Sequence, residues 1–194
     1  TTNAVVALGT ARLANLSIRS AAGTDSDTLI VGFYVGQGTA PSLLVRGIGP
    51  TLAAFGVNGT VADPVLTLYR AGGAVLGSND DWGSGADAAR ITTAAAQSGA
   101  FALAAGSRDA ALVVPLAPGG YTAPVTAPDG ASGVVLLETY DASPTSSSYL
   151  VNASTRAFVG TGDNVLIPGF VISGPGSVRV LIRAVGPTLG SFGV

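Results

Sequence analysis

A 45-residue stretch of this sequence occurs twice, and the repeat constrains the fold more than any other feature. Residues 13–57 (copy 1) return without a gap as residues 150–194 (copy 2), at an offset of 137 positions, with 19 identical pairs among the 45. The residues between the copies occur once. They comprise the B segment, residues 58–142, and a polar linker, residues 143–149. The order is A, B, A, so one copy has no B segment of its own.

Each copy contains three apolar runs that are typical of β-strands, separated by clusters of Gly, Asp and Pro. In copy 1 the runs are residues 13–19, 29–35 and 42–48. The third run of copy 2, residues 178–185, alternates Val180 and Ile182 with Arg179 and Arg183. This period of two predicts a strand rather than a helix.

The B segment and the N-terminal residues also read mostly as short strands. Five runs are bounded by Gly, Pro and Asp: residues 65–70, 74–77, 110–116, 121–126 and 133–140. Residues 1–12 form another apolar run, and the Ala, Gln and Thr content of residues 86–100 predicts one short helix. We therefore expect an all-β fold, an antiparallel β-sandwich or jelly-roll-like structure, with a single short helix.

Composition excludes several classes of function. Nine Arg residues against eleven acidic residues give a net charge of −2, which offers no basic surface for nucleic acid. No apolar run reaches the 18 residues typical of a membrane-spanning helix. His and Cys are absent and Glu138 is the single Glu, so the usual catalytic bases and nucleophiles are missing and we expect no enzymatic activity. Hydrophobic residues nevertheless make up 47% of the chain, which indicates an apolar sheet core and apolar contacts with neighbouring molecules.

Two parts of the sequence resemble modules of exported bacterial proteins. The run Ala62–Trp82, ADPVLTLYRAGGAVLGSNDDW, and the later Leu116–Thr122, LAPGGYT, resemble the pre-peptidase C-terminal type of β-sandwich over residues 62–141. The strings GTGDNVLIPGF and LIRAVGPTL of copy 2 resemble a Gly-rich β module that large exported bacterial proteins carry in tandem. These resemblances imply an accessory or structural domain of a secreted protein, without a catalytic residue. The helical stretch after Trp82 is longer than that sandwich needs.

One polar loop is a candidate ligand site. Asn79, Asp80 and Asp81 offer oxygen ligands of the kind that calcium prefers, and Trp82 follows them directly. A Trp at a loop can stack on a sugar ring. The alternatives are that Asn79, Asp80 and Asp81 form and cap a turn, and that Trp82 is a core plug or lid.

Arg46 and Arg183 occupy the same position in the two copies, inside otherwise apolar strands. Either they make intermolecular contacts or bind anions, or they pair with Asp at a sheet surface, because an unpaired Arg in such a strand is costly.

The leading functional hypothesis is an extracellular structural protein whose subunits assemble head to tail into a filament or surface array, with itself as partner. A 45-residue copy is too small to bury its own apolar face, so the spare copy must pack on something else. Strand complementation is the expected mechanism, with Val5, Val6 and Leu8 of an N-terminal donor strand and with Val180, Ile182, Arg46 and Arg183 as assembly residues.

The alternative hypothesis is a non-catalytic accessory module that binds carbohydrate or another surface through the Asn79–Trp82 loop, with or without calcium. In that case the 194 residues are expected to be a segment of a longer repeat array.

Overall fold

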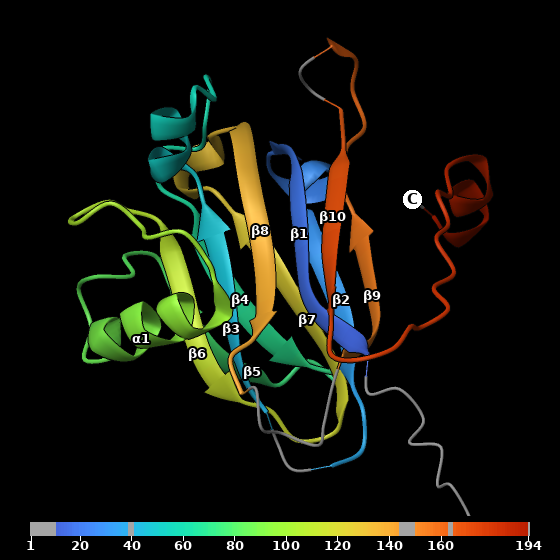
Figure 1. Cartoon of the computed structure of the whole chain (residues 1–194). Helices are drawn as coiled ribbons and strands as arrows, with labels where there is room; N and C mark the ends of the chain where they lie inside the picture. Colours follow the sequence, from blue (N-terminus) through green and yellow to red (C-terminus); the bar gives the residue numbers. More distant parts are fainter. Residues whose placement is uncertain (1–10, 39–40, 144–149, 163–164, 194) are drawn as a thin grey trace, which may run out of the picture.

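Ten strands of the described residues form one antiparallel sheet, which folds so that two parts of it, described below as two sheets, face each other (Figure 1). The computed structural model describes residues 11–38, 41–143, 150–162 and 165–193. The strands are β1 (Arg12–Ala22), β2 (Leu29–Val35), β3 (Ser42–Ile48), β4 (Val65–Arg70), β5 (Val75–Asn79), β6 (Ala110–Pro115), β7 (Gly119–Thr126), β8 (Gly133–Asp141), β9 (Leu150–Arg156) and β10 (Ile167–Ser173). The predicted all-β, sandwich-like fold is confirmed, and the helix expected over residues 86–100 is α1 (Ala88–Ser98).

Copy 1 and the B segment are interleaved in both sheets. One sheet has the order β5-β4-β7-β2-β9 and the other has the order β6-β3-β8-β1-β10, with a single bridge between Leu13 and Leu150 linking them. The three strands of copy 1 each lie beside strands of the B segment: β1 pairs with β8, β2 with β7, and β3 with both β6 and β8. Copy 1 and the B segment therefore form one domain with one core.

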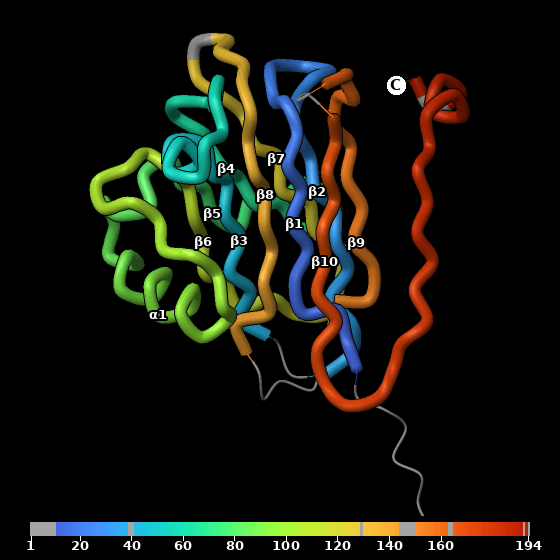
Figure 2. Tube along the Cα trace, turned by 45° about the horizontal axis from the view of Figure 1, so that its top comes forward, coloured from blue at the N-terminus to red at the C-terminus, as the bar shows by residue number. Residues whose placement is uncertain are grey.

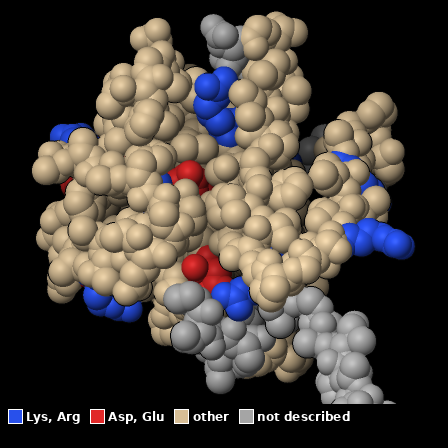
Figure 3. Space-filling view, viewed as in Figure 1, with Lys and Arg blue, Asp and Glu red and all other residues tan. Residues whose placement is uncertain are grey.

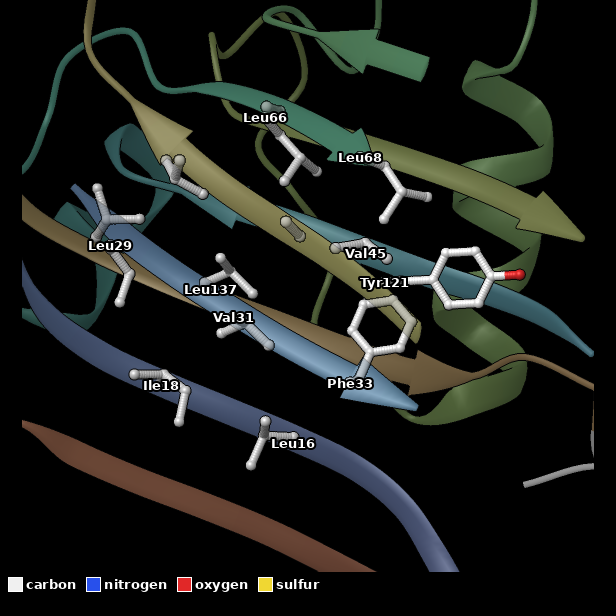
Figure 4. Packing of buried hydrophobic residues seen from close by; sticks show 14 of the residues in the cluster. Leu16, Ile18, Leu29, Val31, Phe33, Val45, Leu66, Leu68, Tyr121 and Leu137 are labelled. Carbon is white, nitrogen blue, oxygen red and sulfur yellow. The ribbon is translucent and has the colours of Figure 1, made fainter. Parts of the chain in front are cut away.

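The core lies between the sheets and is built from alternate residues of each strand, as the period of a strand requires (Figure 4). Val31 and Phe33 of β2 point toward the same interior as Ile18 of β1 and Leu68 of β4. The Phe33 ring stacks on Tyr121 of β7 with 5.5 Å between the ring centroids. Strands from distant parts of the chain thus contribute to one apolar layer.

Helix α1 covers the outer face of β3 and β6. Its buried residues Ile91, Ala94 and Ala95 follow the i, i+3, i+4 spacing of one helix face and pack against Leu44 of β3. Gly99, with a φ of 74°, ends the helix in the left-handed conformation that Gly adopts at low cost. Because α1 lies outside and the core lies inside, β3 is covered on both faces.

Four short 3-10 helices complete the described structure: η1 (Asp25–Asp27), η2 (Pro50–Phe55), η3 (Pro128–Gly130) and η5 (Pro187–Phe192). η2 and η5 are equivalent elements of copies 1 and 2.

Copy 2 has no sandwich of its own. β9 and β10 extend the outer edges of the two sheets, where β9 pairs with β2 and β10 with β1. The following residues, 174–193, form a C-terminal arm that runs back along the molecule but stands apart from β9 and β10 (Figures 1 and 2). The strand predicted over residues 178–185 is therefore wrong, because no strand of the described residues lies beside this run to complete a hydrogen-bond ladder.

The N-terminal strand predicted within residues 1–12, including Val5, Val6 and Leu8, falls almost wholly outside the described residues. Residues 144–149 of the linker also lie outside them. Among the described residues, no helix is long and apolar enough to cross a membrane.

Candidate assembly site

A seven-residue motif, Arg-x-x-Gly-Pro-Thr-Leu, closes the third run of both copies. In copy 1 it spans Arg46 to Leu52, at the end of β3 and the start of η2. In copy 2 it spans Arg183 to Leu189, on the C-terminal arm. These seven positions are largely buried in copy 1 and largely exposed in copy 2. Copy 1 therefore shows which groups the motif contacts, and copy 2 shows the same motif without those contacts.

In copy 1 the Arg46 guanidinium is fully buried against the B segment. Arg46 Nε donates to Glu138 Oε2 at 3.0 Å, Nη2 also bonds that oxygen, and Nη1 donates to the Phe101 carbonyl at 2.6 Å. The guanidinium carbon lies 4.4 Å from the centroid of the Phe101 ring and 5.6 Å from that of Tyr140. Glu138 on β8 thus supplies the negative charge that makes burial of Arg46 tolerable.

Tyr140 completes this cluster from the other side of the carboxylate. Its hydroxyl donates to Glu138 Oε1 at 2.9 Å. Burial, and then the adjacent Glu138 carboxylate, raise the pKa of Tyr140 well above its usual range. The phenol therefore stays protonated and remains a hydrogen-bond donor to Glu138 at any physiological pH.

A second buried carboxylate holds the turn that follows. Asp109, with no exposed surface, accepts hydrogen bonds from the backbone N–H of Gly49 at 2.9 Å and of Thr51 at 3.3 Å. The hydroxyls of Thr51 and Ser107 also donate to Asp109, the latter at 2.6 Å. These N–H groups begin η2 and have no partner within the helix, so the carboxylate acts as its cap.

Arg46 was recognisable from the sequence, but its surroundings were not. Arg46 is 0% exposed and paired within the chain, so its prediction as an assembly contact is wrong. The alternative predicted an ion pair with Asp at a sheet surface; Arg46 does form an ion pair, but with Glu138 and in the interior. A single Glu in an otherwise apolar strand was the available signal for this pair.

The same motif in copy 2 has none of these partners among the described residues. Arg183 is exposed, and so are Gly186 and Thr188, the counterparts of Gly49 and Thr51. Leu181 and Ile182 are 84% and 70% exposed. Their counterparts in copy 1, Leu44 and Val45, are both 0% exposed. Copy 2 therefore presents an apolar run with an Arg and a helix start, all exposed to solvent.

The two copies pair with each other through β2–β9 and β1–β10, and we call these two pairings the joint. The joint is reciprocal. Every pair between β2 and β9 has its counterpart between β1 and β10 with the copies exchanged. The β2–β9 pairs are Ile30↔Arg156, Val31↔Thr155, Gly32↔Ser154, Phe33↔Ala153, Tyr34↔Asn152 and Val35↔Leu150. Their counterparts between β1 and β10 are Arg19↔Ile167, Ile18↔Pro168, Ser17↔Gly169, Leu16↔Phe170, Asn15↔Val171 and Leu13↔Ile172. Even the register shift next to the last pair is repeated.

Small residues allow this close approach. A Cβ on Gly32 would lie 3.0 Å from Ser154 Oγ, and a Cβ on Gly169 would lie 3.0 Å from Ser17 Oγ. Both Gly and both Ser are identical between the copies. The joint thus accounts for repeat identities that lie outside the Arg-x-x-Gly-Pro-Thr-Leu motif.

The joint uses only one edge of each strand of copy 2. In copy 1 the other edge of β1 pairs with β8 and the other edge of β2 pairs with β7. In copy 2 the corresponding edges of β9 and β10 have no strand beside them in the described part of the chain, apart from the single Leu13↔Leu150 bridge at the start of β9. We define the copy 2 face as these two edges together with residues 178–189 of the C-terminal arm.

The Asn79–Trp82 loop is occupied by internal contacts. Asn79 Oδ1 accepts from the Ala111 N–H at 2.8 Å and its amide donates to the Asp81 carbonyl at 3.2 Å. Trp82 Nε1 lies within hydrogen-bond distance of Ser107 Oγ at 3.2 Å. Its ring packs against the apolar cluster beneath α1, and it lines a hollow of about 190 Å³. These contacts agree with the alternative that Trp82 is a plug.

Within the described residues, no three side chains of His, Cys, Asp or Glu gather as metal ligands. Calcium binding by Asn79, Asp80 and Asp81 and carbohydrate stacking by Trp82 stay predictions.

Family models, curated proteins and solved structures give no match to this chain. The resemblances of residues 62–141 and of copy 2 to exported bacterial modules also stay predictions.

Proposed function

We propose that this protein is an extracellular structural protein, without catalytic activity, whose sandwich modules join into a filament or surface array through the copy 2 face. The observation that carries the proposal is the exposed apolar run of residues 178–185, which lacks, among the described residues, the strand pairing that its counterpart β3 makes with β6 and β8. An exposed apolar patch of this kind is typical of an interaction site. The sole Glu of the chain is committed to an ion pair, in agreement with a non-catalytic role.

The exposed side chains supply the driving force for assembly. Val180, Leu181, Ile182 and Val185 are 47%, 84%, 70% and 44% exposed. Burying a side chain of this size stabilises a complex by about 1.5–3 kcal/mol relative to full exposure. The open edges of β9 and β10 add unpaired backbone groups, which favour the addition of further strands. The copy 2 face is thus the part of the described surface best suited to holding a neighbour.

The extracellular setting of the proposal rests on the sequence. Copy 2 and the B segment resemble exported bacterial modules, and the chain has neither Cys nor Lys. An N-terminal donor strand remains a separate possibility of the same proposal. The copy 2 face does not depend on it.

Self-association of the purified chain tests the proposal. We expect sedimentation velocity and light scattering to show species that grow with protein concentration, and negative-stain microscopy to show ordered polymers. Leu181→Asp combined with Ile182→Asp should yield a monomer, because both carboxylates would have to be buried on assembly.

A matched control uses the opposite side of the sandwich. Val75 and Leu76 are consecutive exposed residues of the edge strand β5, 59% and 41% exposed. Val75→Asp combined with Leu76→Asp should leave assembly unchanged. A parent chain that stays monomeric at all concentrations, or a control variant that abolishes assembly as completely as the test variant, would contradict the proposal.

A further inference from the structure

We infer that the copy 2 face binds a second B-type segment, a half-sandwich with the strands and helix of residues 58–142, which presents one carboxylate to Arg183 and another to the N–H groups of Gly186 and Thr188. This inference names the partner of the proposed assembly and rests on that function. It follows from comparing what copy 1 receives from its own B segment with what copy 2 lacks.

The turn that follows Arg183 already has the backbone conformation of its counterpart in copy 1. Gly186 has φ and ψ of −127° and −80°, close to the −123° and −74° of Gly49, where the Asp109 carboxylate binds. Gly193 ends η5 at a φ of 76°, the same value that Gly56 has at the end of η2. The turn that Asp109 caps in copy 1 thus forms in copy 2 without a carboxylate. A preformed turn reduces the entropy lost on binding.

Strand edges determine how the partner would lie. β9 is the counterpart of β1, so its open edge fits a strand equivalent to β8. β10 is the counterpart of β2, so its open edge fits an equivalent of β7. Residues 179–185 are the counterpart of β3, so they fit between equivalents of β8 and β6. One B-type segment offers all three strands in the required arrangement.

Charge favours the same partner. The arm residues 174–193 contain two charged side chains, Arg179 and Arg183, and blue Arg atoms project from this part of the surface at the right of Figure 3. The B segment, residues 58–142, has eight Asp or Glu against three Arg, a net charge of −5. Two of those carboxylates, Glu138 and Asp109, already hold the motif of copy 1. The arm is basic and the B-type segment is acidic. This difference in charge favours pairing of the arm with a B-type segment over pairing of two arms or of two B-type segments.

A second copy of the same 194 residues can cover the apolar residues of this face, but it does not supply a free B-type segment with the two carboxylates. Each chain contains two copies of A and one B segment, so any number of identical chains leaves one A per chain without a B segment. The partner is therefore a B-type segment additional to residues 58–142, belonging to a neighbouring module.

One position indicates that the natural partner differs from the B segment of this chain. A Cβ on Gly47 would lie 3.1 Å from a methyl carbon of Val125, and copy 2 has Ala184 at the position of Gly47. The partner of copy 2 should carry a side chain smaller than Val where the B segment has Val125. The face thus discriminates between B-type segments by size as well as by charge.

The test is a fusion of the full chain to a second copy of residues 58–142 placed after Val194, with Val125→Ala in the added copy. Hydrogen exchange measured by mass spectrometry should show fast exchange of the amides of residues 179–185 in the parent chain. In the fusion these amides should be slowed at least about 100-fold, because exchange would require opening of a docked strand. The amides of β3 report in the same sample that the first sandwich is folded.

A double-mutant cycle tests the assigned ion pair within the fusion. Arg183→Met alone and Glu138→Leu in the added copy alone should each reduce the protection of residues 179–185, since each leaves a buried charge unpaired. The two together should restore most of it. Independent effects of the two substitutions would overturn the Arg183 assignment, and unprotected residues 179–185 beside a folded first sandwich would overturn the inference.

The two proposals fail separately. If the parent chain remains monomeric, the proposed self-assembly is wrong, but slowed exchange of residues 179–185 in the fusion still supports the B-type partner. Ordered polymers of the parent chain with no protection in the fusion keep the structural function and overturn the B-type partner.

Discussion

Arg46 and Arg183 are the same residue of a repeated motif, with opposite degrees of burial in one molecule. Arg46 is 0% exposed and bonded to Glu138, whereas Arg183 is exposed. Substituting each in turn therefore measures the effect of the surroundings with the chemistry of the side chain held constant.

We predict that Arg46→Met lowers the free energy of unfolding by about 3–5 kcal/mol, because it leaves the Glu138 carboxylate buried without a partner. Arg183→Met should change it by no more than about 0.5 kcal/mol, as expected for an exposed side chain. Urea denaturation of a monomeric background, such as the Leu181→Asp, Ile182→Asp variant, gives both values. Equal losses at the two positions would show that the ion pair with Glu138 does not stabilise the sandwich.

Asp141 gives a prediction about pH. Burial raises its pKa above the ordinary value, while the Ser143 N–H and the Arg12 guanidinium, 3.2 Å away, partly oppose that rise. The folded protein then holds the proton more tightly than the unfolded chain. The stabilising contribution is fully present below the ordinary Asp pKa of about 3.9 and is lost as the pH rises through the raised value.

We therefore expect the free energy of unfolding of the parent, relative to Asp141→Asn, to fall as the pH rises from the ordinary Asp pKa through this window. Urea denaturation at a series of pH values measures the difference, with the exposed Asp80→Asn as a control for the loss of a carboxylate. A difference that rises with pH would mean that the Arg12 pairing outweighs burial.

At the scale of elements, copy 2 divides into a part that the first sandwich needs and a part that it does not. Leu150 at the start of β9 is 3% exposed and belongs to the core, and Ala153, Ala157 and Leu166 pack against it. The C-terminal arm stands apart from this core (Figure 2).

Deleting residues 177–194 should accordingly change the free energy of unfolding by no more than about 0.5 kcal/mol. Deleting residues 150–194 should lower it by at least about 3 kcal/mol, since it removes buried Leu150 and uncovers the edges of β1 and β2. Thermal and urea denaturation compare the two truncations. A large loss from the shorter deletion would mean that the arm packs on the sandwich in solution.

Strands with strong local patterns were predictable, and pairings between distant segments were not. β2, β3 and β4 begin and end at the predicted residues because apolar runs and flanking turn residues define them locally. Residues 178–185 have the same pattern as β3 but form no strand, because a strand also requires neighbours. Whether a run finds neighbours depends on the rest of the fold.

The candidate site was likewise predictable only where the signal was local in the sequence. The repeat made Arg46 and Arg183 visible as equivalent residues, yet Glu138 and Asp109 lie 92 and 60 positions from the groups they bind, Arg46 and Gly49. No local spacing links such partners. Their pairing depends on β8 and β6 lying on either side of β3, which the sequence pattern alone did not predict.

At the scale of the whole molecule, the two sheets contact each other at one side of the sandwich, and the opposite side has unpaired strand edges. On the first, β5 and β6 lie together, with Gly77 packed against Leu112 and Asn79 bonded to the Ala111 N–H. On the other, the outer edges of β9 and β10 have no strand beside them in the described residues, apart from the single Leu13↔Leu150 bridge. Growth of an assembly is therefore expected from the side that carries copy 2.

The reciprocal register between the copies also determines the direction of such an assembly. Exchange of copy 1 with copy 2 leaves the pairing unchanged, so the joint has an approximate two-fold axis. Two sandwiches joined there would point in opposite directions, with their β5 and β6 sides at the two outer ends. An assembly built on this joint alone would lack polarity, and the head-to-tail order expected from the sequence would apply to pairs of sandwiches rather than to single ones.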